Sequence, residues 1–206
     1  MEDACRRARN ADSKSRAHVE SLVVSRLIHL NGPPGIGKST LARRFVAEHP
    51  GVLNCDIDAL RTLIGGWERD SGEAGALIRP AALAMIEAYL ANGHDVVLPQ
   101  MLVDPTELAR FEACAVGIGA QFFERVLMDT PAASVTRFHS RGGSASEDPW
   151  HDQVRAIVAA NGGDSVLTGY HAALERLLSE RPDAVVIMSA DGAVEETYCS
   201  FIESLT

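Results

Sequence analysis

The sequence predicts an α/β protein with a parallel sheet. Short β-like runs alternate with longer stretches of helical periodicity, and a glycine-rich loop separates the first run from the first helix. We expect strands at 25–30, 52–55, 95–99, 121–128 and 184–188. We expect helices at 38–48, 59–64, 76–91, 105–116, 131–140, 150–160, 169–180 and 194–204.

The first strand, loop and helix carry the most informative motif. The apolar run Leu27-Ile28-His29-Leu30 indicates a buried strand, and the following residues match G-x-x-x-x-G-K-[ST] at every fixed position. Glycines let backbone N–H groups curl around a di- or triphosphate, Lys38 offers a charge to the outer phosphates, and the Ser39 hydroxyl suits Mg²⁺. The motif predicts a nucleotide site formed by Gly32, Pro33, Pro34, Gly35, Ile36, Gly37, Lys38, Ser39 and Thr40.

The predicted helix at 76–91 shows a stripe of apolar residues at helical spacing. It ends at Asn92-Gly93, because glycine tolerates the left-handed conformation of a helix C-terminus. The stripe that we expect to face the core consists of Leu77, Ala81, Leu83, Ala84 and Ala88.

Composition limits the function classes. The chain of 206 residues is short enough for one core, and we expect an arm at 1–23 followed by a single domain at 24–206. A net charge of −9 argues against a dedicated nucleic-acid binder and against adhesion to an anionic membrane. No run of 18 apolar residues or secretory signal is visible, and the four cysteines lie far apart, so we expect a cytoplasmic protein with reduced thiols.

Two carboxylates follow the predicted second strand. In open parallel sheets, ligands bind outside the carboxyl ends of the strands. Asp58 is the candidate base for a substrate hydroxyl, or alternatively the N-cap of the next helix. Asp56 is the candidate Mg²⁺ ligand, directly or through water. Arg61 would hold the acceptor, balance Asp58, or lie solvated.

The third strand does not end in the acid that commonly organises Mg²⁺ in enzymes with this loop. Gln100 stands near that position, and Asp104 follows four residues later. Three alternatives remain: Asp56 carries the metal, Gln100 contacts the substrate, or Asp104 curls back to the site.

Arginines and aromatic residues supply the remaining candidates. Arg137 and Arg141 are spaced i, i+4 before a Gly/Ser-rich segment, and we expect a lid at about 137–160 that brings them to a transferring phosphoryl group. The alternatives are that the segment is a plain surface loop and that the two arginines pair with Glu147 and Asp148 on the surface. Trp67 would stack on a planar or sugar-like acceptor, or cover the core. The seven histidines show no zinc-binding spacing.

With the Gly32–Ser39 loop and Asp56-x-Asp58-x-x-Arg61, the chain resembles the P-loop small-molecule kinases. More narrowly, it resembles kinase-like bacterial proteins described as AAA family ATPases. They border on the chloramphenicol phosphotransferase, zeta-toxin and polynucleotide 5′-kinase families, and more distantly on shikimate and gluconate kinases.

This resemblance implies a three-layer α/β/α P-loop NTPase fold with a five-stranded parallel sheet in the order 2-3-1-4-5 and an arginine-bearing lid. It also implies a substrate-facing base at Asp58, a binding role for Arg61, and an adenine-side loop after the last strand, at 185–192.

The expected function is transfer of the γ-phosphate of ATP, with Mg²⁺, to a hydroxyl of a metabolite, nucleoside or antibiotic-like compound. One alternative is a nucleotide-binding switch that acts on a protein partner. Two others are a kinase for nucleic-acid 5′-hydroxyl ends and a toxin-type kinase for a sugar nucleotide. The acceptor and the oligomeric state are not legible in the sequence.

Overall fold

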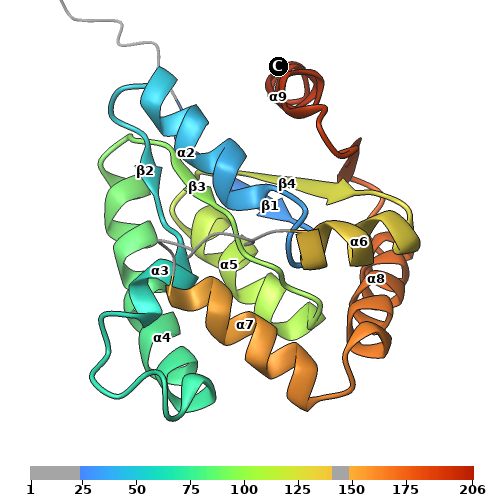
Figure 1. Cartoon of the computed structure of the whole chain (residues 1–206). Helices are drawn as coiled ribbons and strands as arrows, with labels where there is room; N and C mark the ends of the chain where they lie inside the picture. Colours follow the sequence, from blue (N-terminus) through green and yellow to red (C-terminus); the bar gives the residue numbers. More distant parts are fainter. Residues whose placement is uncertain (1–23, 141–148) are drawn as a thin grey trace, which may run out of the picture.

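The computed structural model describes residues 24–140 and 149–206 (Figure 1). The predicted arm at 1–23 and Arg141 lie outside the described residues. The described strands form one parallel sheet in the order β2-β3-β1-β4-β5, which confirms the predicted fold class and strand order. The strands are β1 (Arg26–Asn31), β2 (Leu53–Asn54), β3 (Val96–Leu98), β4 (Gln121–Met128) and β5 (Val185–Met188).

Helices cover both faces of this sheet, as Figure 1 shows. Helices α2 and α9 pack on one face, and α4 and α5 pack on the other, with α8 beside them. The helices are α2 (Lys38–Glu48), α3 (Ile57–Arg61), α4 (Ser71–Ala91), α5 (Pro105–Gly117), α6 (Pro131–Ser140), α7 (Pro149–Ala160), α8 (Asp164–Ser179) and α9 (Val194–Glu203).

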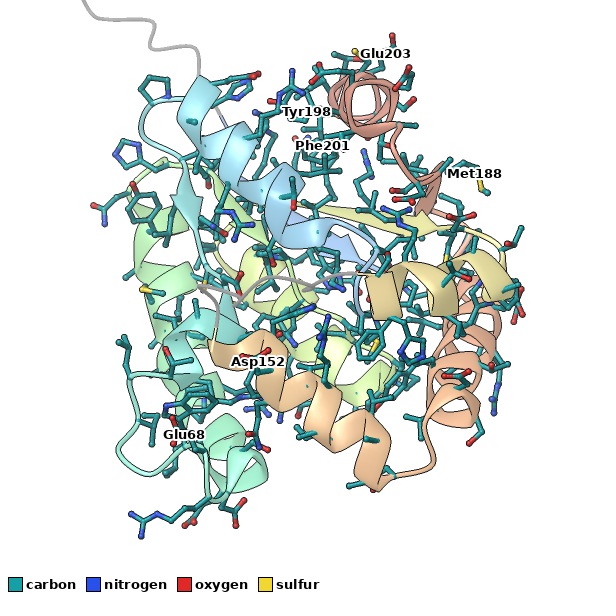
Figure 2. All side chains as sticks on the ribbon, in the orientation of Figure 1. Glu68, Asp152, Met188, Tyr198, Phe201 and Glu203 are labelled. Carbon is teal, nitrogen blue, oxygen red and sulfur yellow. The ribbon has the colours of Figure 1, made fainter. Side chains whose placement is uncertain are left out.

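The central strand β1 is buried on both faces, which explains its continuous apolar run. Leu27 packs toward α4 and α5, whereas Ile28 and Leu30 pack toward α2 and α9. Tyr198 and Phe201 project from α9 toward α2 on that second face (Figure 2). Parallel pairing of β1 with β3 and β4 therefore places the ends of three strands at one edge of the sheet.

Strand β5 is the outermost strand of the sheet on the side opposite β2. Only Ile187 of this strand is buried, while Val185, Val186 and Met188 are exposed. Met188 points away from the sheet in Figure 2. The segment that follows Met188 lies beside the glycine loop, where the Ser189 hydroxyl donates a hydrogen bond to the Ile36 carbonyl.

Three predicted helix starts were wrong, and two of the corrections come from aspartate caps. Asp56 accepts hydrogen bonds from two backbone N–H groups of α3, so that helix begins at Ile57 rather than at 59. Asp70 caps α4 by accepting one hydrogen bond, from the Glu73 backbone N–H at 2.8 Å, and this helix begins at Ser71 rather than at 76. Helix α8 begins at Asp164, five residues earlier than the 169 that the sequence predicts.

The predicted core-facing stripe of α4 was also wrong. Leu77 is 59% exposed, and the face that packs on the sheet is rotated by one position. The pattern was ambiguous because apolar residues surround most of this helix, so its period does not single out one face. The buried residues of α4 are Ala74, Gly75, Ile78, Ala82, Ile86 and Leu90.

Helix α4 is also long and apolar enough to cross a membrane by length and composition alone. The helix contains Glu73, Arg79 and Glu87, so it is not an uninterrupted run of 18 apolar residues. In this fold α4 contacts α3 and α5 and packs over β1 and β3. Ala82 and Ile86 are fully buried there, and this packing accounts for the helix's apolar composition.

The turn from β1 into the glycine loop yields a test. Gly32 has φ +140°, and a Cβ at this position would lie 2.5 Å from the Leu127 carbonyl oxygen of β4. We expect Gly32→Ala to lower the free energy of unfolding by about 2 kcal/mol or more, measured by urea denaturation.

Gly119→Ala is the matched control, because Gly119 also has positive φ (+78°) but no described atom lies within 4 Å of the point that its Cβ would occupy. This control carries only the left-handed strain of about 1 kcal/mol. Equal destabilisation by the two substitutions would contradict the steric argument.

Candidate active site

The glycine loop runs from the end of β1 to the first turn of α2. Gly37 precedes α2 with φ +115° and lacks a side chain that would cap the helix, so the first backbone N–H groups of α2 face the loop. The backbone N–H groups of Thr40 and Leu41 donate hydrogen bonds to the Gly37 carbonyl oxygen, with N···O distances of 3.1 and 3.0 Å. The positive end of α2 is therefore available to an anion that lies in the loop.

Lys38 lies over this loop. Its Nζ donates hydrogen bonds to the carbonyl oxygens of Gly32 (2.7 Å) and Pro33 (3.0 Å). Half-buried, the ammonium is held next to the backbone that would surround a phosphate. This arrangement fits the role predicted for Lys38 as a point charge for the outer phosphates.

The outer side of the loop is bound by two other elements. The Ile36 carbonyl accepts hydrogen bonds from Arg137 Nη2 of α6 (2.9 Å) and from the Ser189 hydroxyl after β5 (3.1 Å). Arg137 also donates to the Ser189 carbonyl and lies 3.4 Å from Asp129. These contacts fix the loop, α6 and the segment after β5 relative to one another.

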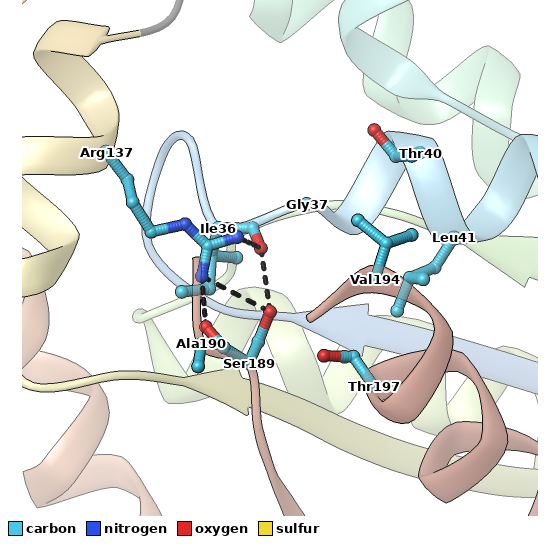
Figure 3. Close-up of a pocket in the computed structure, with 9 residues that line it drawn as sticks. All are labelled: Ile36, Gly37, Thr40, Leu41, Arg137, Ser189, Ala190, Val194 and Thr197. Atoms are coloured by element: carbon cyan, nitrogen blue, oxygen red, sulfur yellow. Dashed lines mark hydrogen bonds between the residues drawn. The ribbon is translucent and has the colours of Figure 1, made fainter. Parts of the chain in front are cut away.

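A pocket opens beside this contact, and Figure 3 shows it between α2, Arg137 and the start of α9. Both apolar side chains and hydroxyl groups line it, which suits a planar group that carries a few polar atoms. The lining residues are Ile36, Gly37, Thr40, Leu41, Arg137, Ser189, Ala190, Val194 and Thr197.

Arg137 therefore lines the pocket and contacts the glycine loop. Its guanidinium lies near Gly37, where a Cβ would be 3.8 Å from Nη2. The predicted role of Arg137 at a transferring phosphoryl group stays a prediction, and its predicted partner Arg141 lies outside the described residues. The lid predicted at 137–160 is described only in its helices, α6 and α7.

Asp58 lies in the first turn of α3, on the other side of the loop. Burial raises the pKa of its carboxyl group; Arg61 counteracts this, Asp56 adds to it, and Lys38 counteracts it. Asp58 Oδ1 lies 3.5 Å from Arg61 Nη2. The alternative that Asp58 caps α3 was wrong, since Asp56 is the cap. Asp56 Oδ1 is thus engaged with backbone N–H groups, and its role as a metal ligand stays a prediction.

Arg61 is 8% exposed, so the alternative of a solvated arginine was wrong. Its guanidinium lies 4.0 Å from the ring centroid of Trp150, the second residue of α7. On α4, a Cβ added to Gly75 would lie 3.1 Å from Arg61 Nη2, so the guanidinium packs closely against this helix. Arg61 therefore joins α3, α4 and α7 beside Asp58.

Trp67 and Trp150 meet at the same place. Their ring centroids are 6.2 Å apart, and both side chains are half-buried. Sequence reasoning singled out Trp67 and missed Trp150, which also contacts Asp58. The available signal was an aromatic residue at the start of a helix directly after a Gly/Ser-rich segment.

Gln100 follows β3 and is 7% exposed. Its backbone carbonyl accepts a hydrogen bond from His29 Nε2 at 2.8 Å, while its side-chain Oε1 is buried with no hydrogen-bond partner among the described residues. A buried polar atom of this kind usually marks a place where water or ligand binds. The alternative that Asp104 curls back to the site was wrong, because Asp104 caps α5 by accepting from Thr106 N at 2.8 Å.

The profile of a protein family described as an AAA domain matches residues 27–158. The chain belongs to this family. The matched segment runs from β1 through the glycine loop and the Asp58 region into α7.

Solved structures share the fold of this AAA-domain protein. The tunicamycin resistance protein of Deinococcus radiodurans matches with a TM-score of 0.56 and 17% identity, covering 88% of this chain and 95% of that one. A gluconokinase from Sinorhizobium meliloti matches with a TM-score of 0.52 and 19% identity, covering 89% and 96%. At these identities the likeness concerns the fold, which is that of P-loop kinases. No curated protein matches the chain.

The site of this AAA-domain protein suits a magnesium ion bound mainly by its nucleotide. Within residues 24–140 and 149–206, no group of three or more His, Cys, Asp and Glu side chains is placed to hold a metal. Mg²⁺ in nucleotide sites keeps several waters and takes few protein ligands, and so needs no such group. Ser39, half-buried beside Lys38, is in place for one contact, and Gln100 Oε1 is an unpaired oxygen at the same edge of the sheet.

His29 lies fully buried in β1 beneath this edge. Burial lowers its pKa to about 4, the hydrogen bond to Gln100 O counteracts this, and the positive charges of Lys38 and Arg181 add to the lowering. The unfolded chain binds a proton at pH 6.5, whereas the folded protein does so only near pH 4. Protonation of His29 therefore removes stability as the pH falls from 6.5 toward 4, by about 3 kcal/mol in total.

We expect His29→Gln to flatten the dependence of unfolding free energy on pH between 6.5 and 4, measured by urea denaturation at a series of pH values. His94→Gln is the matched control, because it removes a histidine that is exposed rather than buried. Parallel pH profiles for His29→Gln and the unmodified protein would show that His29 is not buried in its neutral form.

Proposed function

We propose that this AAA-domain protein is an ATP- and Mg²⁺-dependent phosphotransferase that moves the γ-phosphoryl group to a hydroxyl of a small molecule. The observation that carries the proposal is the position of Asp58. Strands β1 and β2 both pair in parallel with β3, so Lys38 after β1 and Asp58 after β2 lie at the same edge of the sheet, and Lys38 lowers the pKa of the desolvated Asp58 carboxyl group. A proton acceptor next to a phosphate-binding group is what transfer to a hydroxyl requires.

The nucleotide would lie along the loop and the pocket beside it. The phosphates face the backbone N–H groups of Gly35–Thr40 and Lys38, and the base enters the pocket between Leu41 and Arg137. The hydroxyl groups of Thr40 and Thr197 give that pocket polar atoms for a heterocycle. The segment after β5, which contributes Ser189 and Ala190, then serves as the adenine-side loop.

In the proposed reaction the acceptor oxygen attacks the γ-phosphorus as its proton passes to Asp58. The bond between the γ-phosphorus and the β–γ bridging oxygen breaks, and ADP leaves. Because burial raises the pKa of Asp58, the carboxylate is a better proton acceptor than an exposed aspartate. Mg²⁺, when bound, neutralises charge on the β- and γ-phosphate oxygens, and Ser39 is the residue that would hold it.

The acceptor would lie between Asp58, Gln100 and the paired tryptophans. Gln100 Oε1 can accept a hydrogen bond from a second hydroxyl, and the half-buried rings of Trp67 and Trp150 offer an apolar surface for a sugar or planar group. The existence of a gluconokinase with the same fold agrees with a polyhydroxyl acceptor. The net charge of −9 supports a small molecule over nucleic acid.

The first test addresses nucleotide binding. We expect Lys38→Ala to weaken binding of ATP·Mg²⁺ by at least about tenfold, because a charge-assisted contact to phosphate is worth about 1.5–3 kcal/mol. Calorimetry measures this directly. Arg43→Ala is the matched control, since Arg43 is exposed on the same helix and leaves the affinity unchanged. Undiminished binding by Lys38→Ala would rule out the proposed nucleotide site.

The second test addresses the base. A panel of hydroxyl compounds is screened for an ATP-dependent phosphorylated product by mass spectrometry. With the best acceptor, we expect Asp58→Asn to lower the rate by about 100-fold or more, while calorimetry shows unchanged ATP affinity. The exposed Asp183 serves as the control, with Asp183→Asn fully active. Retention of more than about a third of the activity by Asp58→Asn would refute the assignment, since a general base contributes far more.

A further inference from the structure

We propose that Trp150 is a positioning residue for Asp58, which it holds both by its indole N–H and by the Arg61 guanidinium stacked on its ring. This inference rests on the proposed function, in which Asp58 is the base. It adds a residue from α7 to a site that the sequence builds from the glycine loop and α3. The orientation of the base then depends on the docking of α7 against α3.

Two contacts of Trp150 reach Asp58. A hydrogen bond from the Trp150 side chain favours the charged form of the Asp58 carboxyl group and so acts to lower its pKa. The ring face carries the guanidinium of Arg61 at 4.0 Å, and Arg61 Nη2 lies 3.5 Å from Asp58 Oδ1. Arg61 packs against α4 at Gly75, where an added Cβ would lie 3.1 Å from its Nη2. Trp150 and Arg61 thus form a stack that holds the guanidinium 3.5 Å from Asp58 Oδ1, a buried oxygen with no hydrogen-bond partner among the described residues.

Contacts along the length of α7 hold this helix beside the stack. Val158 on α7 is buried against Phe138 of α6 and Leu167 of α8. Near its beginning, Gln153 Nε2 donates to the Glu68 carbonyl at 3.5 Å, and Trp150 meets Trp67. Figure 1 shows α7 running from α3 toward α8, and Figure 2 labels Glu68 and Asp152 on the facing segments.

Several charged groups also face Asp58. Lys38 from α2 and Arg61 from α3 favour the carboxylate, Asp56 disfavours it, and Arg79 of α4 acts on Arg61. The indole N–H of Trp150 is a neutral donor that also favours the carboxylate. Removing this N–H while keeping an aromatic ring leaves all four charges in place, so it isolates the contribution of the hydrogen bond.

The test uses ¹⁵N-labelled full-length protein without nucleotide or acceptor. The chain has two tryptophans, so its two indole N–H resonances are assigned with Trp67→Phe and Trp150→Phe. We expect the Trp150 resonance to shift with pH as Asp58 ionises, and this titration to disappear in Asp58→Asn. Asp152→Asn is the matched control, because Asp152 is an exposed carboxylate on α7, and it leaves the titration unchanged.

A second arm follows Asp58 itself by its carboxyl ¹³C resonance. We expect Trp150→Phe to raise the midpoint of this titration by about one pH unit, because the hydrogen bond favours the charged form. A Trp150 indole resonance that does not respond to pH, or that titrates equally in Asp58→Asn, overturns the proposal. Should Trp150→Phe fail to fold, the first arm still decides the outcome in protein that retains Trp150.

These readouts are independent of catalysis. If the indole titration depends on Asp58 but no hydroxyl compound is phosphorylated, the proposed function fails and the contact between Trp150 and Asp58 stands. If phosphorylation depends on Asp58 but the indole resonance is insensitive to pH, the proposed function stands and the positioning role of Trp150 fails.

Discussion

Close backbone packing of the glycine loop is the constraint on which the rest of the site depends. Gly32 lies against the Leu127 carbonyl, and a Cβ on Gly35 would lie 3.2 Å from the Phe138 Cα of α6. The loop therefore occupies space that only backbone can fill, and its Ile36 carbonyl is bound by both Arg137 and Ser189. Because α6 and the segment after β5 both hydrogen-bond the Ile36 carbonyl, the position of the loop determines the position of the pocket walls.

The two sides of the site are formed by different kinds of chemical group. The nucleotide side consists of main-chain groups, a helix end and one ammonium, which any chain with the same loop can supply. The proposed acceptor side consists of side chains from α3, α4 and α7 around Asp58, with Arg61 between Trp150 and Gly75. If the proposed function holds, side chains determine which acceptor binds, whereas backbone shape determines how the phosphates bind.

The glycine loop could be predicted because it is one contiguous motif. The sheet order could be predicted because it follows from the family that the motif indicates, and the structure confirms this order. It misassigned the core face of α4, since apolar residues surround that helix and only the neighbouring strands decide which side is buried. It missed Trp150 because the contact with Asp58 joins segments 92 residues apart in the chain, and no spacing pattern reports such a contact. The sequence did not predict the burial of Arg61 either, because this burial arises from packing against Trp150 of α7 and Gly75 of α4.

The pairing of Trp67 with Trp150 has a practical consequence. No other tryptophan occurs in the sequence, so light absorbed at the red edge of the protein's ultraviolet band excites only these two neighbouring indoles. The intrinsic emission of the unlabelled protein thus originates beside Asp58, and a compound that settles there changes its colour or intensity. The protein therefore has intrinsic fluorophores at the place where the proposed acceptor would bind.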